Sequence, residues 1–400
     1  MTMHLSPAVG GFVAPGFEPV RDAFERVLAA RGELGAAVAA VVGNRPVVDL
    51  WGGAADAGGR RRWAEDTLVL CFSATKGMAA TAVAVAVAQG LLDLDAPVAA
   101  YWPEFGQSGK REIPVRQLLA HQAGLSAIDL RLDAAVIADW DRLTAALARQ
   151  APLWRPGTRH GYHSVTLGFY ESELLRRVDP RGRRLGPFFR DEVAAPLGVE
   201  FYIGLPASVP AHRVADVRGW RAWRMGLHLR ALPQRMIAAY AVPTSLTARS
   251  LGNPRLANPA NMDSPEYRAI EFPAATGVGS ARALAAVYGE LATGGKRLGL
   301  DGATFAALTA APQPPSGGVR DLVLHVDTSY SAGFWRPFPA FPFGSARAFG
   351  TPGAGGAMGF ADPARALGYG FVTNRMGFHV WDDPREVTVR QALLRCLPLR

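Results

Sequence analysis

The first part of the chain carries a helical hydrophobic pattern followed by two short apolar runs. Residues 35–42 and 46–51 are the apolar runs, and the Gly-Asn-Arg turn at 43–45 between them suits a hairpin. Before them, residues 17–34 place four apolar side chains at helical spacing among Arg and Glu: Val20, Phe24, Val27 and Leu28. The pattern predicts an amphipathic helix and then two paired strands.

A longer apolar stretch surrounds Ser73. The run at 67–72 leads directly into this serine, and the following segment at 74–89 is rich in Ala, Met and Val. Such content favours a buried helix, and Gly90 is a suitable terminator. The sequence therefore predicts that Ser73 lies at the N-terminus of a buried helix.

Residues 93–272 carry no strand pattern except at 200–203. Within 206–271 the chain is rich in Pro, Arg, Trp and Met and has poor periodicity, so we expect an irregular excursion that partly covers a cleft. Its segment 220–236 is aromatic and apolar. The other parts of this region predict helices and loops, with helices at 115–120, 140–150, 164–178 and 187–195.

The pattern changes again after Gly277. A helix is expected at 280–293, then strands at 330–335, 356–361 and 367–374, and a last helix at 385–397. Strands at both ends of the chain predict an α/β (α+β) fold, with an antiparallel sheet flanked by helices and built from both chain ends. We expect this sheet domain to comprise 1–92 and 273–400, with 93–272 as an inserted, mostly helical domain and the active site at their junction.

Charge and cysteine content narrow the class of protein. The 400-residue chain has a formal net charge of +9, which comes almost entirely from scattered arginines. The basic runs at 60–62 and 176–184 lie in no recognisable nucleic-acid motif, so we expect a solvated basic surface and no nucleic-acid partner. Cys71 and Cys396 are too few for a disulfide framework or a cysteine metal site, which favours a reducing compartment.

Two stretches, 1–20 and 78–92, are the candidates for a signal-peptide or membrane segment. The stretch 1–20 has no Lys or Arg and no sustained apolar core, so it does not resemble a signal peptide. The most apolar stretch, 78–92, is too short to span a bilayer. We therefore expect a soluble, cytoplasmic protein with no membrane partner, while its oligomeric state is left open.

Ser73 and Lys76 form the first candidate for chemistry. A serine hydroxyl is a good nucleophile only when a base accepts its proton. Positions i and i+3 share a face of a helix, so the Lys76 amine is expected beside the Ser73 hydroxyl. The helix N-terminus favours a developing oxyanion, and desolvation of Lys76 would make its neutral form accessible. Taken alone, Ser-x-x-Lys is a weak pattern, and a helix-capping serine followed by a surface lysine is the simpler interpretation.

A tyrosine turn and a glycine-rich segment are the second and third candidates. Tyr162 ends a Pro- and Gly-rich turn before a predicted helix, and we expect an exposed phenol that points into a cleft, where nearby cations would lower its pKa. Without other signals it is equally a rim aromatic. The glycines of 349–356 allow a substrate or another backbone to approach closely, although a bulged turn would have the same composition.

The order of these elements resembles the serine β-lactamase and penicillin-binding-protein superfamily, nearest to its class C β-lactamase-like esterases and transesterases. Ser73-x-x-Lys76, Tyr162-x-Ser164 and the segment Thr351-Pro352-Gly353 are similar to its three motifs. Further stretches also resemble the family: 94–98, 115–125, 154–162 and 277–286. The resemblance implies a β-lactamase/transpeptidase-like fold.

The resemblance also implies roles for residues. Ser73 would form the acyl-enzyme, and Lys76 with Tyr162 would share the general base and acid work. Ser164 would hydrogen-bond near Lys76. The oxyanion hole would consist of the backbone N–H groups of Ser73 and Ala354. Substrate contacts would come from Thr351, Gly353 and Trp154.

Two departures from the family pattern bear on the substrate. Ser164 stands where the family commonly has Asn, and Thr351 stands where it often has Lys or His. A neutral Thr351 cannot pair with a substrate carboxylate, which disfavours β-lactam and peptidoglycan substrates; Arg347 or Arg375 could supply the missing charge. A carboxylic ester is therefore favoured, in line with the apolar segment 220–236.

The histidines near Tyr162 suggest a different base. His121, His160 and His163 would suit a Ser-His pair, but no Gly-x-Ser-x-Gly elbow surrounds any serine, so we favour the Lys/Tyr arrangement and expect His160 and His163 to shape the cleft. No His-x-x-x-His pair or carboxylate cluster suggests a metal, and no cofactor is expected.

The sequence thus predicts a serine hydrolase that cleaves a small-molecule ester, amide or other acyl donor. Three alternatives stay open. The first is an acyltransferase that passes the acyl group to an amine or alcohol, as relatives in natural-product biosynthesis do. The second is a non-catalytic binding protein with the same fold. The third is a DD-peptidase or β-lactamase, which needs an envelope location and a carboxylate-binding group.

Overall fold

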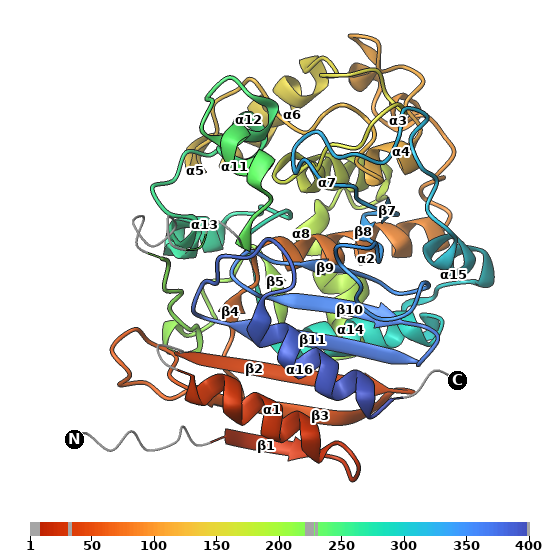
Figure 1. Cartoon of the computed structure of the whole chain (residues 1–400). Coiled ribbons are helices and arrows are strands. Elements are labelled where there is room, and N and C mark those ends of the chain that lie inside the picture. The colour runs from red at the N-terminus through yellow and green to blue at the C-terminus, as the bar shows by residue number, and fades with distance from the viewer. Residues whose placement is uncertain (1–8, 31–33, 221–227, 229–230, 398–400) are drawn as a thin grey trace.

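The computed structural model describes residues 9–30, 34–220, 228 and 231–397. Its centre is an eight-stranded antiparallel sheet with the order β1-β3-β2-β11-β10-β9-β8-β7 (Figure 1). Strands from the two ends of the chain meet where β2 pairs with β11, which confirms the predicted architecture. The strand bounds are β1 Val9–Val13, β2 Gly35–Val42, β3 Arg45–Gly53, β7 Tyr330–Ser331, β8 Phe334–Trp335, β9 Phe349–Pro352, β10 Met358–Asp362 and β11 Leu367–Thr373.

Helices cover both faces of this sheet. α1 (Glu18–Ala29) and α16 (Pro384–Arg395) pack against each other on one face, while α14 (Ala281–Ala292) lies on the other and contacts β11, β10 and β2 (Figure 1). β11 alternates between large residues toward α1 and α16, such as Tyr369, and the glycines Gly368 and Gly370 toward α14. The period of two in a strand produces this division.

Several predicted elements of the sheet domain are confirmed. The helix at 17–34 is α1, with positions 31–33 outside the described residues, and the predicted hairpin is β2 and β3. The helix at 280–293 is α14, the strands at 356–361 and 367–374 are β10 and β11, and the last helix is α16. The edge strand β1 was not predicted, because two of its five residues are glycines.

The single strand expected at 330–335 was wrong. The chain instead forms two dipeptide strands, β7 and β8, joined by a turn in which Ala332 and Gly333 have φ of 50° and 85°. Such a tight reversal needs positive φ, which Gly333 supplies at little cost. The short apolar run concealed this reversal.

The middle of the chain is mostly helical, as expected. Its predicted helices correspond to α4 (Val115–Leu119), α6 (Trp140–Arg149), α7 (Thr166–Val178) and α8 (Leu185–Phe189), which continues into the helical turns Arg190–Ala194 and Ala195–Leu197. Other short helices here are α3 Val98–Tyr101, α5 Ala134–Ala138, α11 Gln234–Tyr240, α12 Leu246–Leu251 and α13 Pro265–Ala269. In the segment expected to cover the cleft, 206–271, positions 221–227 and 229–230 lie outside the described residues.

A second, three-stranded sheet connects the two regions. Its order is β4-β6-β5, with β4 Val69–Leu70, β6 Gly277–Gly279 and β5 Phe201–Ile203. The strand expected at 200–203 therefore exists and pairs with a strand from the sheet-forming part of the sequence. The division at 92 and 273 stays a prediction.

The helix α2 (Thr75–Ala88) runs between these layers and contacts α7, α8, α15 (Gly302–Thr309) and β9. Every residue from Thr75 to Ala86 is buried, so the helix is enclosed on all sides. A lysine on such a helix is desolvated unless it reaches the surface. Lys76, in its first turn, has only 1% of its surface exposed.

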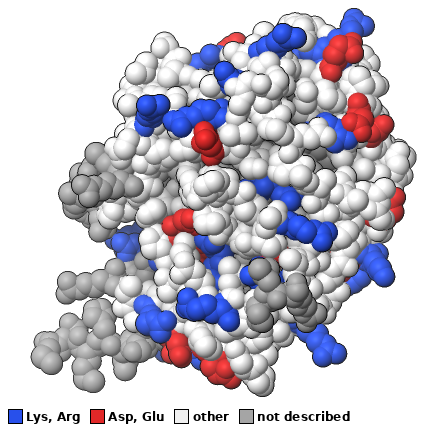
Figure 2. Space-filling model, turned by 45° about the vertical axis from the view of Figure 1, so that its right-hand side comes forward, with Lys and Arg blue, Asp and Glu red and all other residues white. Residues whose placement is uncertain are grey.

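On the face shown in Figure 2, Lys and Arg side chains are spread over the surface and separated by neutral areas. Within the described ranges, no helix combines the length and apolar character needed to cross a bilayer.

Candidate active site

The turn that carries Ser73 is strained. β4 runs into a short 3-10 helix, Phe72–Ala74, in which Phe72 has φ of 47°, a left-handed conformation that costs a non-glycine residue about 1–3 kcal/mol. The Thr75 hydroxyl stabilises the turn, because it donates to the Phe72 carbonyl at 2.5 Å and accepts from the Gly277 N–H at 2.9 Å. In this strained turn, the half-buried Ser73 lies directly before the N-terminus of α2.

The Lys76 amine has a complete set of partners. Its Nζ lies 3.1 Å from Ser73 Oγ, 2.6 Å from the Ser164 carbonyl and 2.8 Å from the Ala274 carbonyl. An ammonium would donate all three hydrogens. A neutral amine would donate two of them to the carbonyls and keep its lone pair for the serine. The two carbonyls therefore direct the amine toward Ser73.

Burial favours the neutral form of Lys76. Desolvation lowers its pKa to about 7, against an opposing effect from the carboxylate of Glu171. Glu171 on α7 is itself fully buried, and among the described residues its carboxyl oxygens have no hydrogen-bond partner. Burial raises the Glu171 pKa to about 8, and the Lys76 charge opposes that rise. The expected desolvation of Lys76 is thus present.

Tyr162 lies beside the same pair. The Lys76 Nζ is 5.1 Å from the centre of its ring, which packs against Trp335 at 5.3 Å and stacks on Tyr330 at 6.2 Å. The expectation of an exposed phenol with a lowered pKa was wrong. The side chain is 5% exposed, and burial raises its pKa to about 12, although a hydrogen bond with the Ser73 hydroxyl opposes the rise. At neutral pH the phenol therefore carries its proton.

Ser164 contributes through its backbone. Its carbonyl accepts from Lys76, whereas its hydroxyl donates to the Ser250 carbonyl at 2.5 Å. The residue is thus near Lys76, as the sequence suggested. The side chain instead fastens the start of α7 to the end of α12.

The three histidines support the tyrosine turn. His121 Nδ1 accepts from the His163 N–H at 3.0 Å, and His163 Nε2 accepts from the Leu125 N–H at 3.3 Å. Burial lowers the pKa of His121 well below its usual value, that of His163 to about 3 and that of His160 to about 4. The neutral rings of His121 and His163 thus accept from backbone N–H groups, whereas His160 Nδ1 lies 3.4 Å from the Val319 carbonyl oxygen and 3.3 Å from the Thr328 hydroxyl. Ser73 Oγ accepts from Lys76 Nζ at 3.1 Å and is also hydrogen-bonded to the Tyr162 hydroxyl.

The glycine-rich segment lies directly against the nucleophile turn. A Cβ on Gly353 would lie 2.4 Å from the Cys71 carbonyl oxygen and 3.2 Å from the Ala74 nitrogen, so only glycine fits there. Ala354 follows in the turn between β9 and β10, and within the described ranges its N–H makes no backbone hydrogen bond of the turn or loop type. The segment thus contacts the turn that carries Ser73, and an oxyanion site formed by the Ser73 and Ala354 N–H groups stays a prediction.

Thr351 and Trp154, which were also predicted to contact the substrate, pack against other parts of the protein. Thr351 is fully buried, with its hydroxyl against Gly77 of α2 and Tyr288 of α14. Trp154 donates through Nε1 to the Arg159 carbonyl at 3.1 Å, and its ring occupies the space beside Gly161. These positions make Thr351 and Trp154 part of the walls behind the site. A direct substrate contact by either side chain, or by Gly353, stays a prediction.

Two buried carboxylates near the site were not found from the sequence. One is Glu171. The other is Asp321, which accepts from the Tyr330 hydroxyl at 3.0 Å and from the Val323 and Leu324 N–H groups at 2.8 Å. It thereby fixes the ring on which Tyr162 stacks. The only available signal for Glu171 was an acidic residue in the otherwise apolar start of a helix.

The described residues contain no group of three or more His, Cys, Asp or Glu side chains that could hold a metal ion. Ser73, Lys76 and Tyr162 lie together at the N-terminal end of α2. Their arrangement provides a nucleophile, a buried amine and a protonated phenol around one hydroxyl.

Comparison with known proteins shows the family of this chain. The family model described as Beta-lactamase matches residues 20–393. The esterase/beta-lactamase LipL of Mycobacterium tuberculosis is 34% identical over 404 residues, covering 94% of this chain and 86% of the relative.

Two solved structures are similar over nearly the full length. A family VIII carboxylesterase is 39% identical with a TM-score of 0.85, and a penicillin-binding protein homologue from Caulobacter crescentus is 38% identical with a TM-score of 0.84. Each comparison covers 98% of this chain and 100% of the other. The fold and the superfamily predicted from the three motifs are thus confirmed, and the chain belongs to the beta-lactamase family.

Proposed function

We propose that this protein is a serine hydrolase that cleaves carboxylic esters of small molecules through an acyl-enzyme on Ser73. The observation that carries the proposal is the position of Lys76 Nζ, 3.1 Å from Ser73 Oγ and held by two backbone carbonyls. A buried amine with a pKa near 7 is a suitable general base at neutral pH.

In the first half-reaction, neutral Lys76 accepts the Ser73 proton while Oγ attacks the ester carbonyl carbon. The carbonyl oxygen becomes an oxyanion, which the N–H groups of Ser73 and Ala354 stabilise. As the bond to the alkoxide breaks, a proton passes from Lys76 through the Tyr162 phenol to the leaving oxygen. The products are a free alcohol and an ester of Ser73.

In the second half-reaction, water attacks the Ser73 ester and gives up one proton to the Lys76 and Tyr162 pair. Collapse of the second tetrahedral intermediate breaks the bond to Oγ, which takes back the proton. The carboxylic acid leaves and the enzyme regains its starting state. The same residues therefore act as base and then as acid in each half-reaction.

An ester substrate is supported by the relatives and by Thr351. The relatives named esterase and carboxylesterase match this chain at 34% and 39% identity over nearly its whole length. Thr351 offers no charge to a substrate carboxylate and is fully buried. Slower hydrolysis of nitrocefin than of p-nitrophenyl esters is therefore expected, and comparable rates would favour the β-lactamase alternative.

The nucleophile is tested with p-nitrophenyl butyrate and a fluorophosphonate probe. Ser73→Ala and Lys76→Ala should each lower kcat/KM at least about a thousandfold, since each removes a member of the reacting unit. Ser164→Ala is the matched control, because its hydroxyl faces Ser250 and its carbonyl still holds Lys76. It should keep kcat/KM within about tenfold of the wild type.

Labelling of Ser73→Ala by the probe to the same extent as the wild type would contradict the assignment of the nucleophile. The same assay with added amines or alcohols separates hydrolysis from acyl transfer. Accumulation of the amide or new ester in place of the acid would favour the acyltransferase alternative.

A further inference from the structure

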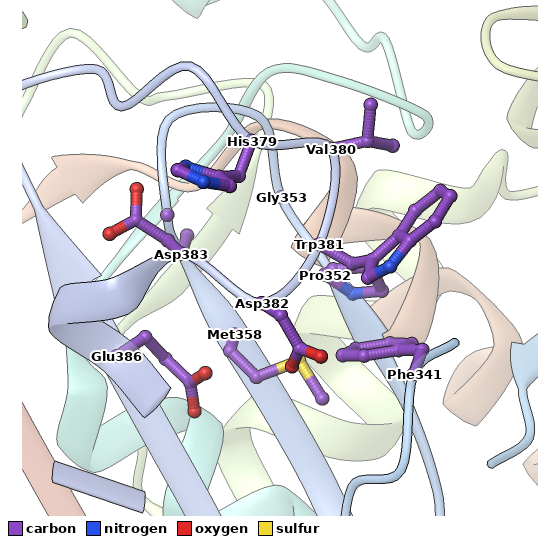
Figure 3. Close-up of a pocket in the computed structure, with 12 residues that line it drawn as sticks. Phe341, Pro352, Gly353, Met358, His379, Val380, Trp381, Asp382, Asp383 and Glu386 are labelled. Carbon is purple, nitrogen blue, oxygen red and sulfur yellow. The ribbon is translucent and has the colours of Figure 1, made fainter. Parts of the chain in front are cut away.

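An ion pair at the start of α16 lies against the glycine-rich segment. The Arg385 guanidinium binds Asp383 through Nε–Oδ1 and Nη2–Oδ2, each at 2.8 Å. Asp383 is 4% exposed and also caps α16 by accepting from the Arg385 N–H at 3.1 Å. Figure 3 shows Asp383 beside the loop that carries Gly353. The guanidinium is therefore held in a fixed orientation.

The same guanidinium also holds two backbone carbonyls. Its Nη2 donates to the Gly355 carbonyl at 2.8 Å, and its Nη1 donates to the Arg375 carbonyl at 2.9 Å. The Gly355 carbonyl accepts a further bond from the Gly377 N–H at 3.0 Å. Arg385 thus links the glycine-rich segment to the chain that follows β11.

Two rigid peptide groups carry this constraint to Ala354. A trans peptide is planar, so fixing the Gly355 carbonyl also fixes the direction of the Gly356 N–H in the same plane. That N–H donates to the Gly353 carbonyl at 3.2 Å. The Gly353 carbonyl in turn shares its plane with the Ala354 N–H. The orientation of Arg385 therefore determines where the Ala354 N–H points.

The packing around Gly356 and Gly377 leaves no room for a larger side chain. A Cβ on Gly356 would lie 3.0 Å from both Arg385 Nη2 and Asp383 Oδ2, and one on Gly377 would lie 1.8 Å from Asp383 Oδ2. Gly355 and Gly356 have φ of 88° and 109°, which other residues rarely adopt. The turn is thus built around the ion pair.

We propose that Asp383 and Arg385 are positioning residues that aim the Ala354 N–H at the substrate oxyanion by holding the Gly355 carbonyl. This inference rests on the proposed function, because it gives the Ala354 N–H its role. Neither side chain is required to touch the substrate.

The test compares Arg385→Gln and Asp383→Asn with Arg390→Gln. Arg390 is the matched control, because it bonds Asp382, Glu386 and the Pro342 carbonyl and contacts no residue of the glycine-rich segment among its described bonds. With a p-nitrophenyl ester, kcat should fall about 10- to 100-fold in the first two variants, while KM stays within threefold of the wild type. The fall is smaller than that expected for removal of an oxyanion-hole donor, because the Ala354 N–H is still present. Arg390→Gln should keep kcat within threefold of the wild type, even if its midpoint of urea unfolding falls more than that of the other two variants.

A second measurement is specific to the oxyanion. Sulfur accepts hydrogen bonds more weakly than oxygen, so an intact oxyanion site favours an ester over the matching thionoester. The rate ratio between the two substrates should fall in Arg385→Gln and stay unchanged in Arg390→Gln. Arg385→Lys, which keeps the charge but not the two-pronged geometry, should recover only part of the loss.

An unchanged kcat in a folded Arg385→Gln protein would overturn the inference, as would an equal loss in Arg390→Gln. Either result leaves the proposed function intact provided that wild-type turnover depends on Ser73. A wild type without Ser73-dependent turnover would overturn the proposed function and this inference together.

Discussion

At the residue scale, the environment of the Lys76 amine sets the pH dependence expected from the proposed mechanism. Lys76 is charged below its pKa of about 7 and neutral above it. Only the neutral amine has a lone pair for the Ser73 proton, so activity should rise as the pH passes through 7. Burial raises the pKa of Tyr162 to about 12, so the phenol should cause no loss of activity on the alkaline side below about pH 10.

The Glu171→Gln variant tests the effect of the Glu171 carboxyl group on the Lys76 pKa. Because the Glu171 pKa is itself raised to about 8, Glu171 is only partly ionised where Lys76 titrates, and its ionised form favours the charged form of Lys76. Its removal therefore lowers the Lys76 pKa and moves the acid limb of kcat/KM to lower pH. The shift should be about 0.5–1 pH unit, measured with a p-nitrophenyl ester between pH 5 and 9.

Glu173→Gln is the matched control, since Glu173 lies on the same helix but bonds Arg176 and Arg177. Its acid limb should stay in place even if the variant is less stable. An acid limb that moves equally in both variants, or in neither, would contradict the influence assigned to Glu171.

At the scale of the elements, glycines set the distance between α14 and the sheet. A Cβ on Gly368 of β11 would lie 2.0 Å from the Gly289 nitrogen and 2.3 Å from the Ala285 carbonyl oxygen, both on α14. The helix therefore rests directly on the strand. Because these contacts are with backbone atoms, no side-chain rotation can relieve an added methyl group.

Gly368→Ala should lower the free energy of unfolding by about 1–3 kcal/mol, measured by urea denaturation. The matched control is Gly302→Ala at the start of α15, where a Cβ would meet nothing within 4 Å. That change should be neutral or raise stability by about 0.4–1 kcal/mol through the unfolded chain. Equal stability of the two variants would show that α14 can move away from β11.

At the scale of the whole molecule, the two ends of the chain complete one sheet and one core. β2 pairs with β11 over seven residues, from Ala36 with Thr373 to Val42 with Leu367. On the face above them, α1 packs on α16, and Leu393 of α16 is fully buried. A substitution that disrupts α16 should therefore also destabilise the N-terminal strand β2.

Leu393→Asp should prevent the formation of a folded monomer or lower the free energy of unfolding by more than about 4 kcal/mol, because it buries an unpaired charge. Gln391→Asp places the same side chain at an exposed position of α16 and should change stability by less than about 0.5 kcal/mol. Hydrogen exchange should show β2 and β11 losing protection together in Leu393→Asp. Retained protection in β2 would contradict the joint core.

The sequence by itself determined the elements with strong periodicity and the three motifs. The helices α1, α14 and α16 and the strands β2, β3, β10 and β11 followed from local pattern, because a period of 3.6 or 2 reports which face is buried. Ser73, Lys76 and Tyr162 were found because their order along the chain resembles a known superfamily. Dipeptide strands such as β7 and β8 have too few residues to show a period.

Only the tertiary structure determined the protonation states of these groups and the contacts that hold them in place. The raised pKa of Tyr162 and the lowered pKa of Lys76 come from burial, which segments distant in sequence produce together. The left-handed Phe72 and the Asp383–Arg385 pair have no local signature either, and the only local sign of Glu171 was an acidic residue in the apolar start of a helix. Desolvation and backbone orientation depend on the whole packed core, whereas a motif records only which residues are neighbours along the chain.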